Sequence, residues 1–256
     1  MIQAVVLGSG TSNGVPMLGR EYPEGYLDDP RNWRTRASLL LKGPTGNLLI
    51  DCAPELRLQM AREREYDVEA VLITHTHADH VMGMDDLRSL CLKYQRAMPV
   101  FTLPRYQDDI RRIYPYAFQE FPAGVWVPRF DLTDCPAVLK VGGMEIHTFV
   151  VDHGKTPVIG IRVGDFAYVT DVSHIPPEAE AMLQGLNTLI LDAVRIEPHP
   201  NHFHLAAALA QVEKLRPRQT YLTHLSHDYD HAVTERELPE SVKLAFDGLV
   251  LTVSDH

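Results

Sequence analysis

The sequence lacks the features of a disulfide-stabilised or membrane-spanning protein. Its only three cysteines, Cys52, Cys91 and Cys135, lie far apart in the chain, a spacing that provides neither a disulfide framework nor a CxxC metal site. No apolar run approaches the ~20 residues that a membrane helix needs. The first residues also lack the basic region and the apolar stretch of a secretory signal. We therefore expect a cytoplasmic protein in a reducing compartment, without a membrane partner.

An excess of positive charge is also absent. The formal net charge is -10 and the isoelectric point is about 5.7, so the surface repels nucleic-acid phosphates at long range. We therefore expect a small-molecule partner in preference to a nucleic acid polymer. No repeat, low-complexity tract or linker divides the 256 residues, which predicts one domain spanning residues 1–256.

Short apolar β-type runs alternate with helical patterns along the chain. The expected strands cover residues 2–10, 36–52 (a hairpin around 43–46), 67–75, 98–104, 144–154, 160–171, 187–194, 219–224 and 242–253. The expected helices cover residues 84–94, 105–118, 176–186 and 205–217. Strand-rich halves with helices after particular strands favour two sheets with helices outside them over one doubly wound parallel sheet.

Histidine is the residue in excess, and its densest cluster follows an apolar strand. The chain has 13 histidines, and the segment "HTHADH" contains His75, His77, Asp79 and His80. Alternate side chains of extended backbone share a face, so His75 and His77 can point toward one ion. Asp79 and His80 follow where the chain bends into a helix, so they can face a second point nearby. Imidazole and carboxylate ligands suit zinc, manganese or iron, which predicts a metal site here.

Further candidate ligands end later strands. His153, Asp171 and His224 each terminate an apolar β-type run, and the carboxylate of Asp171 could bridge two ions. Taken alone, a histidine or aspartate at a strand end is more often a turn or capping residue. Because all three occur in order after the HxHxDH segment, the sequence indicates a site for two divalent metal ions.

This order of residues resembles the metallo-β-lactamase superfamily, and the resemblance covers nearly the whole chain. It implies an α/β fold, the four-layer αββα sandwich, with Zn²⁺ or Mn²⁺ as the two ions. It also implies a ligand set, in which His75, His77 and His153 hold one ion, Asp79, His80 and His224 hold the other, and Asp171 bridges them. By the same resemblance, "LLIDCAPE" implies that Asp51 supports the metal-binding turn.

Other segments narrow the resemblance to the phosphodiesterase branch. The segments "GSGTSNGVP", "RTRASLLL", "PNHFHLAAAL", "YLTHLSHDYD" and "AFDGL" are similar to those of PhnP-like cyclic phosphodiesterases. The resemblance implies a hydrolase of small phosphodiesters, cyclic ones included, and a homodimer. In that branch the Asn-His pair before the last long helix supplies a catalytic histidine beside the scissile phosphate. The matching pair here is Asn201-His202.

Hydrolysis of a phosphodiester requires a proton donor beside the leaving group. A hydroxide held between two metals attacks phosphorus, and the departing alkoxide needs a proton, which a histidine can give. We therefore expect His202 to be the general acid, with Asp79 and Asp171 taking part in catalysis through the metals. The alternative is that Asn201 and His202 serve only the start of the following helix.

The remaining histidines lie outside the implied ligand set. His227 either orients a ligand histidine or lies at the rim, and His174 lies near enough to Asp171 in the sequence to touch substrate. We interpret His204 as structural or substrate-lining, and His147 and His199 as surface or structural.

One segment departs from the branch. Residues 20–36, "REYPEGYLDDPRNWRTR", contain none of the cysteines that bind a structural zinc in PhnP-like enzymes, so we expect this loop to be organised differently. Arg31, Arg34 and Arg36 within it either attract a phosphate or form a solvated face, and the second reading is favoured.

Three other functions stay open. A tRNA 3′-processing endonuclease shares the metal motifs, but the chain shows no basic glycine-rich arm. A thioester or lactone hydrolase of the glyoxalase II kind is disfavoured by the short segment after His224. A non-catalytic metal-binding protein is disfavoured because all seven ligand positions are present.

Overall fold

The computed structural model describes residues 1–122 and 124–254 as two seven-stranded β-sheets with helices outside them. One sheet contains β1 (Ile2–Gly8), β2 (Ser38–Lys42), β3 (Asn47–Ile50), β4 (Ala70–Leu72), β5 (Met98–Thr102), β6 (Phe130–Asp134) and β14 (Val250–Val253), in the order β14-β1-β2-β3-β4-β5-β6. The other contains β7 (Val138–Val141), β8 (Met144–His153), β9 (Thr156–Val163), β10 (Phe166–Val169), β11 (Thr188–Asp192), β12 (Gln219–Thr223) and β13 (Val242–Leu244), in the order β13-β12-β11-β10-β9-β8-β7.

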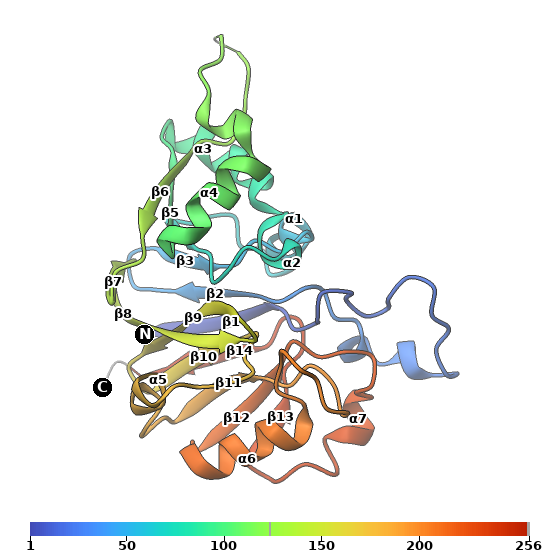
Figure 1. Cartoon of the computed structure of the whole chain (residues 1–256). Helices are drawn as coiled ribbons and strands as arrows, with labels where there is room; N and C mark the ends of the chain where they lie inside the picture. The colour runs from blue at the N-terminus through green and yellow to red at the C-terminus, as the bar shows by residue number, and fades with distance from the viewer. Residues whose placement is uncertain (123, 255–256) are drawn as a thin grey trace.

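Helices cover the outer face of each sheet (Figure 1). The α-helices are α1 (Leu56–Arg62), α2 (Ala78–Val81), α3 (Arg88–Tyr94), α4 (Pro104–Ile113), α5 (Pro177–Met182), α6 (Leu205–Leu215) and α7 (His231–Thr234). Short 3₁₀ turns are η1 (Tyr26–Asp28), η2 (Pro30–Asn32), η3 (Met84–Leu87) and η4 (Pro115–Phe118). The predicted α/β fold with four αββα layers is confirmed. Among the described helices, none has the length and apolar character to cross a bilayer.

The strands are apolar on both faces because each sheet is covered on both sides. On β2, Leu39 and Leu41 belong to the core between the two sheets, whereas Leu40 faces the layer of α1, α3 and α4. On β10, Tyr168 faces the core between the sheets and Val169 faces the layer of α5 and α6. This period of two explains why the strands read as continuous hydrophobic runs in the sequence.

Strand direction brings the polar strand ends to one edge of the sandwich. Strands β3 to β6 run parallel to one another, and so do β10 to β13. Parallel neighbours end on the same side, and α/β proteins bind their ligands beyond these carboxyl ends. The residues that directly follow β3, β4, β10 and β12 are therefore neighbours in space.

Left-handed backbone marks three of these strand ends. Asp51, Asp171 and His224 have φ of 62°, 51° and 60°. Aspartate and histidine enter this region more readily than most residues with a side chain. The chain therefore turns away from the sheet at the residue whose side chain reaches the edge.

Several sequence expectations need correction. The single strand expected at 160–171 is two antiparallel strands, β9 and β10. The expected helix at 84–94 starts as the 3₁₀ turn η3, and only its second part forms the α-helix α3, which is buried at Cys91. The strands β6 and β7 and the helices α1 and α7 were missed, because each is only four to seven residues long.

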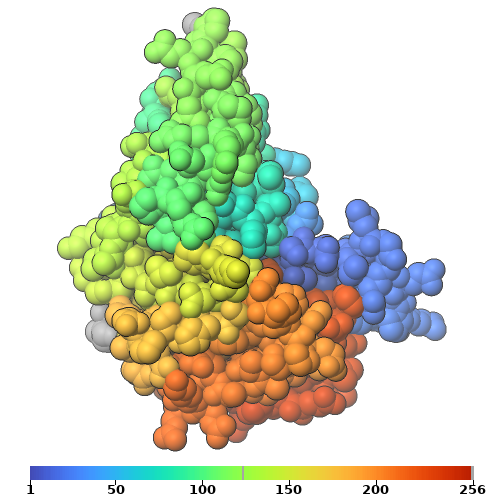
Figure 2. Space-filling model, viewed as in Figure 1, coloured from blue at the N-terminus to red at the C-terminus, as the bar shows by residue number. Residues whose placement is uncertain are grey.

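The segment between β1 and β2 projects from the sandwich as an arm. It appears in blue in Figure 1, beside α7, and forms the protrusion at one side of the space-filling view (Figure 2). The arm includes residues 20–36, the loop without cysteines.

Candidate active site

Seven side chains gather at the edge where the strands end. Their ligand atoms form two groups, within each of which all atoms lie no more than 4.8 Å apart. The first group consists of His75, His77, His153 and Asp171, and the second of Asp79, His80 and His224. These are the seven candidate ligands named from the sequence. The structure places three histidines in the first group and Asp79 with two histidines in the second, the division that the resemblance implied.

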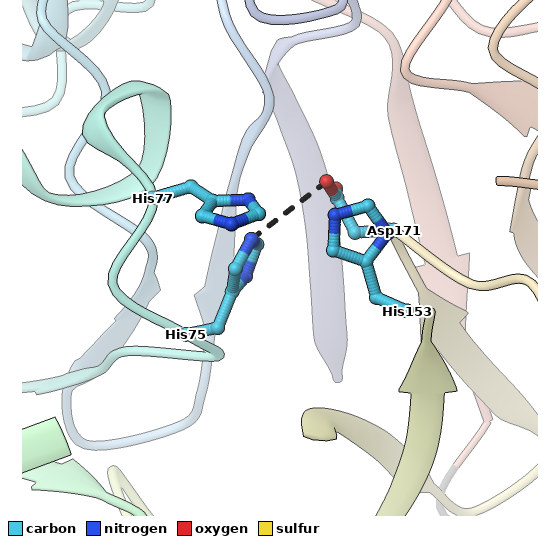
Figure 3. A group of neighbouring side chains, drawn as sticks. All are labelled: His75, His77, His153 and Asp171. Carbon is cyan, nitrogen blue, oxygen red and sulfur yellow. Dashed lines mark ion pairs between the residues drawn. The ribbon is translucent and has the colours of Figure 1, made fainter. Parts of the chain in front are cut away.

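The first group is drawn in Figure 3, where three imidazoles and one carboxylate converge. His75 and His77 come from the segment after β4, and their rings lie 4.5 Å apart at 73°. His153 ends β8 and faces them from the other sheet, with its ring 5.1 Å from that of His77. The group therefore draws its members from both sheets, which no single supersecondary element could supply.

Asp171 lies between the two groups. Its Oδ2 is 3.8 Å from His75 Nε2, whereas its Oδ1 is 3.3 Å from His80 Nε2 and 3.5 Å from His224 Nε2. Asp79 Oδ2 completes the second group at 3.4 Å from His80 Nε2 and 3.5 Å from His224 Nε2. One oxygen of Asp171 thus faces each group, as a bridging carboxylate requires.

Hydrogen bonds from outside the groups fix the histidine rings. His80 donates from Nδ1 to Asp51 over 2.7 Å, and His153 donates from Nδ1 to the carbonyl of Asn201 over 2.6 Å. His75 Nδ1 lies 3.1 Å from Thr74 Oγ1. Because Nδ1 is held on the far side, Nε2 of His75 and His80 faces the centre of the group, the usual arrangement of metal-binding histidines.

Asp51 is buried behind the second group. Besides His80, its carboxylate accepts hydrogen bonds from the backbone N–H and the hydroxyl of Thr74, both over 2.8 Å. Asp51 therefore ties the turn after β4 to the end of β3. It does not belong to either ligand group, which agrees with a supporting role.

The electrostatics of the site demand positive charge. Burial alone would lower the pKa of His80, but Asp171, Asp51 and Asp79 raise it well above its ordinary value. Burial alone would raise the pKa of the Asp171 carboxyl, but His224 and His80 hold it well below its ordinary value. In the absence of a metal ion the positive charge beside these carboxylates comes from the histidines, and a bound cation would supply it in their place.

The residues fit divalent metal ions. His75 Nε2 and His80 Nε2 are buried and make no hydrogen bond within the described part of the chain, which is costly for polar atoms. Both point into a centre lined by carboxylates, and a cation coordinated there would satisfy them. The donors are nitrogen and oxygen without sulfur, a set that suits zinc or manganese.

His202 borders both groups. Its ring lies 4.3 Å from that of His153 and stacks on His224 with ring centroids 4.9 Å apart. Its side chain is 10% exposed. The helix α6 starts only at Leu205, after His204, so His202 lies before the helix and faces the site.

Asp192 is the residue that the sequence analysis missed. It ends β11, between the strands that deliver Asp171 and His224, and it is fully buried. Its Oδ2 accepts hydrogen bonds from His202 Nδ1 over 2.9 Å and from the backbone N–H of Val172 over 3.0 Å. The signal was present: "TLILD" is another apolar run ending in a carboxylate, like the one that ends at Asp171.

The other predicted residues lie around this centre. Asn201 acts through its backbone carbonyl on His153, whereas its side chain is exposed. His174 is exposed and pairs with Asp152 through its backbone. His199, interpreted from sequence as surface or structural, is closer than expected, because its ring lies 4.9 Å from that of His202.

His227 and the arginine cluster also receive positions. His227 is half-buried at the rim, where its Nε2 lies 3.2 Å from Asp228. The interpretation of the arginines as a solvated face is wrong for Arg34, which is 1% exposed. Arg31 pairs with Asp29 and Arg36 with Glu55. The three arginines therefore do not act as one basic cluster.

Comparisons with known proteins agree with this geometry. A family profile described as a Beta-lactamase superfamily domain matches residues 46–225. A crystal structure described as a new diphosphatase from the PhnP family is 34% identical, with a TM-score of 0.91, and the match covers 99% of this chain and 98% of that one.

Two curated relatives are longer proteins. An octanoyltransferase from Porphyromonas gingivalis is 31% identical over 99% of this chain and 52% of its own length. A ribonuclease Z from Agathobacter rectalis is 29% identical over 50% of this chain and 42% of its own length. The chain thus spans about half the length, or less, of these relatives.

Proposed function

The chain belongs to the metallo-β-lactamase superfamily and resembles its PhnP family along its whole length, and from this premise we propose that it is a metal-dependent phosphodiesterase. Its substrates are small phosphodiesters, cyclic ones included, and its two cations are Zn²⁺ or Mn²⁺. The superfamily accounts for the hydrolase fold and for the two groups of metal-binding side chains. The choice of phosphorus as the reacting centre is supported by the PhnP-family neighbour.

The position of His202 carries the proposal. When bound, the two cations would lower the pKa of a water molecule and neutralise charge on the phosphoryl oxygens. His202 lies beside both groups, with ligand atoms of Asp171, His202 and His224 all within 4.8 Å of one another. Asp192 holds Nδ1 of His202, which leaves Nε2 to give a proton to the departing alkoxide.

The same arrangement supports hydrolysis of a diphosphate. The neighbour at 34% identity is described as a diphosphatase, and a diphosphate diester resembles a phosphodiester in which the leaving group is itself a phosphate. Such a leaving group needs less proton donation than an alkoxide. We therefore propose diphosphate diesters as the second candidate substrate class.

The longer relatives do not change this choice. The octanoyltransferase name describes a protein of which this chain matches 52%, so a transfer activity cannot be carried over to this part. Ribonuclease Z cleaves a polymer, whereas this chain has a net charge of -10. Among the described residues of 118–129, which protrude at the top of Figure 1, only Arg129 is basic. Homodimer formation and the single-domain organisation of residues 1–256 stay predictions.

Hydrolysis assays test the proposal directly. Metal-stripped protein is supplied with Mn²⁺ or Zn²⁺ and offered bis-p-nitrophenyl phosphate, a 2′,3′-cyclic nucleotide and ADP-ribose. We expect metal-dependent turnover of a diester, and cleavage of ADP-ribose would place diphosphates first. If protein shown to bind two metals hydrolyses none of the three but cleaves thioesters or lactones, the phosphodiesterase proposal is wrong.

A further inference from the structure

The arm between β1 and β2 is built onto the segment that follows His224. The hydroxyl of Tyr26 lies 3.0 Å from the carbonyl of His227 and 3.1 Å from that of Tyr229. Asn32 donates to the carbonyl of Tyr26 and accepts from the backbone N–H of His231, both over 2.8 Å. These contacts involve buried or half-buried groups, so the arm is held in place by its own polar side chains.

A cavity of about 530 Å³ lies between the arm and this segment. Its walls include Arg20, Tyr22 and Tyr26 from the arm and His227 and Asp228 from the other side. The volume falls in the range of small-molecule sites. The cavity is therefore large enough for an organic group and lies between two ordered walls.

The cavity begins close to the metal-binding edge. His227 follows His224 by three residues, and consecutive Cα atoms are 3.8 Å apart, so their Cα atoms are separated by at most ~11 Å. Leu225, next to His224, pairs with Gly10 at the base of the arm. A group esterified to a phosphate at the metal-binding edge can therefore extend toward this cavity.

One wall of the cavity is aromatic. The rings of Tyr22 and Tyr26 stack with centroids 5.1 Å apart and an angle of 29° between their planes. The Tyr22 hydroxyl accepts a hydrogen bond from the backbone N–H of Met17 over 2.8 Å, and Tyr26 is buried. Because both rings are fixed, they offer a pre-organised surface on which a planar base can stack.

The opposite wall is polar and acidic, because Asp228 and Asp230 line it, whereas Arg20 faces it from the arm. Asp228 is exposed and can accept hydrogen bonds from hydroxyl groups. Burial, together with the positive charge of Arg20, lowers the pKa of His227, so a neutral imidazole and a guanidinium lie near each other. Planar stacking, hydroxyl acceptors and one cation near a phosphate together match a nucleoside with its attached phosphate.

We propose that the cavity between residues 20–26 and 227–230 binds the nucleoside part of a nucleotide ester or nucleoside diphosphate ester. The base stacks on Tyr22, the sugar hydroxyls meet Asp228, and Arg20 and His227 flank the phosphate. The inference rests on the proposed function, because it places this nucleoside on the substrate of the same metal site.

The test compares two substrates with one leaving group. The p-nitrophenyl ester of AMP and methyl p-nitrophenyl phosphate release the same phenolate, and only the first carries a nucleoside. Removal of an aromatic ring on which a base stacks typically lowers the affinity by about 5- to 150-fold. Tyr22→Leu should raise KM for the AMP ester about tenfold and leave kcat/KM for the methyl ester within about twofold.

Matched variants separate binding from folding. Tyr22→Phe keeps the ring and loses only the hydrogen bond from Met17, so it should retain most of the affinity for the AMP ester that Tyr22→Leu loses. Asp228→Asn should weaken only the AMP ester. Tyr66→Leu, at a tyrosine that is 69% exposed outside this cavity, serves as the control. Equal losses on both substrates in Tyr22→Leu and Asp228→Asn, or no loss on either, would overturn the proposal.

Binding without turnover separates this inference from the proposed function. Equilibrium dialysis of metal-stripped protein with AMP should show saturable binding that Tyr22→Leu weakens about tenfold. If neither ester is hydrolysed by metal-loaded protein but AMP binds in this way, the cavity assignment holds and the phosphodiesterase proposal fails. If the esters are hydrolysed but neither Tyr22→Leu nor Asp228→Asn changes AMP binding, the phosphodiesterase proposal holds and the cavity assignment fails.

Discussion

His202 donates a hydrogen bond from Nδ1 to Asp192 Oδ2 over 2.9 Å, and the other oxygen of the same carboxylate lies 3.7 Å from His224 Nδ1. Asp192 therefore contacts the proposed general acid on one side and approaches a metal-binding histidine on the other. It is fully buried and also accepts the backbone N–H of Val172. The orientation of the proton donor and the geometry of the second ligand group thus depend on one side chain.

Asp192→Asn should slow turnover by about 10–100-fold, the span typical of residues that orient catalytic ligands. An asparagine amide carries no negative charge and can itself donate to His202 Nδ1, so it stabilises the doubly protonated imidazolium, the form that gives up a proton, less than the carboxylate does. The loss should be larger for an alkyl leaving group than for p-nitrophenolate, because only the alkoxide needs the proton. The measurement is kcat/KM for both leaving groups, with metal content checked in parallel.

Asp131→Asn is the control, since Asp131 is exposed on β6 at a distance from the site along the sheet order. A loss in Asp192→Asn that is independent of the leaving group would mean that Asp192 acts on the metal ligands instead of the acid.

His202→Ala should retain both metals and reduce turnover by about 10²–10⁴, the contribution typical of a general acid. The reason is that His202 borders the ligand groups but is not needed to complete the seven-residue set. Metal content and the turnover rates for an alkyl and a p-nitrophenyl leaving group distinguish a general acid from a metal ligand. Asp131→Asn, the exposed control on β6, should behave as the native protein. Loss of one metal in His202→Ala would instead identify this histidine as a ligand.

Asp171→Ala should reduce bound metal from two ions to none, because one of its oxygens faces each group. His153→Ala is the matched comparison and should affect only the first group. Elemental analysis of dialysed protein measures both. Asp171→Ala protein that still binds two ions would contradict the bridging assignment.

The fold should lose stability in mild acid through His231. Its side chain is 1% exposed, and burial lowers its pKa to about 4, with Glu235 and Asp29 opposing the shift and Arg31 and Arg34 adding to it. The unfolded chain therefore takes up this proton first, as the pH falls through 6.5. Stability from this group is complete above pH 6.5 and declines down to about pH 4.

Between pH 7.5 and pH 5 the decline from His231 alone should be on the order of 2 kcal/mol. Urea unfolding of the native protein and of His231→Gln at the two pH values isolates the contribution of His231, because the two proteins share every other titrating group. The free energy of unfolding should fall less steeply with acid in the variant. Equal declines would mean that His231 is protonated in the folded protein.

The sequence predicted the fold well where local chemistry decides. The segment after β4 and the strand ends at His153, Asp171 and His224 could be selected because each polar residue interrupts an apolar run. Their assembly followed from parallel strands that end on one edge. Asp192 also ends an apolar run, but it was not among the predicted residues. Its proposed role depends on a hydrogen bond to His202 that only the tertiary structure reveals.

The arm was harder to predict because its order comes from long-range contacts. Arg34 looked like a surface charge in a basic cluster, yet it is 1% exposed and contacts Tyr26 and Asn32. Nothing in residues 20–36 signals that their partners lie in residues 227–231. The cavity between them is likewise invisible to a reading of local pattern.

The left-handed backbone at Asp51, Asp171 and His224 has a consequence for protein engineering. Glycine relieves the conformational cost of a positive φ, so a search for thermostable variants would be drawn to these three positions. Each such gain would remove a side chain that supports or forms the two ligand groups. Selection for heat resistance alone would therefore tend to inactivate this protein, and a stability screen needs an activity readout beside it.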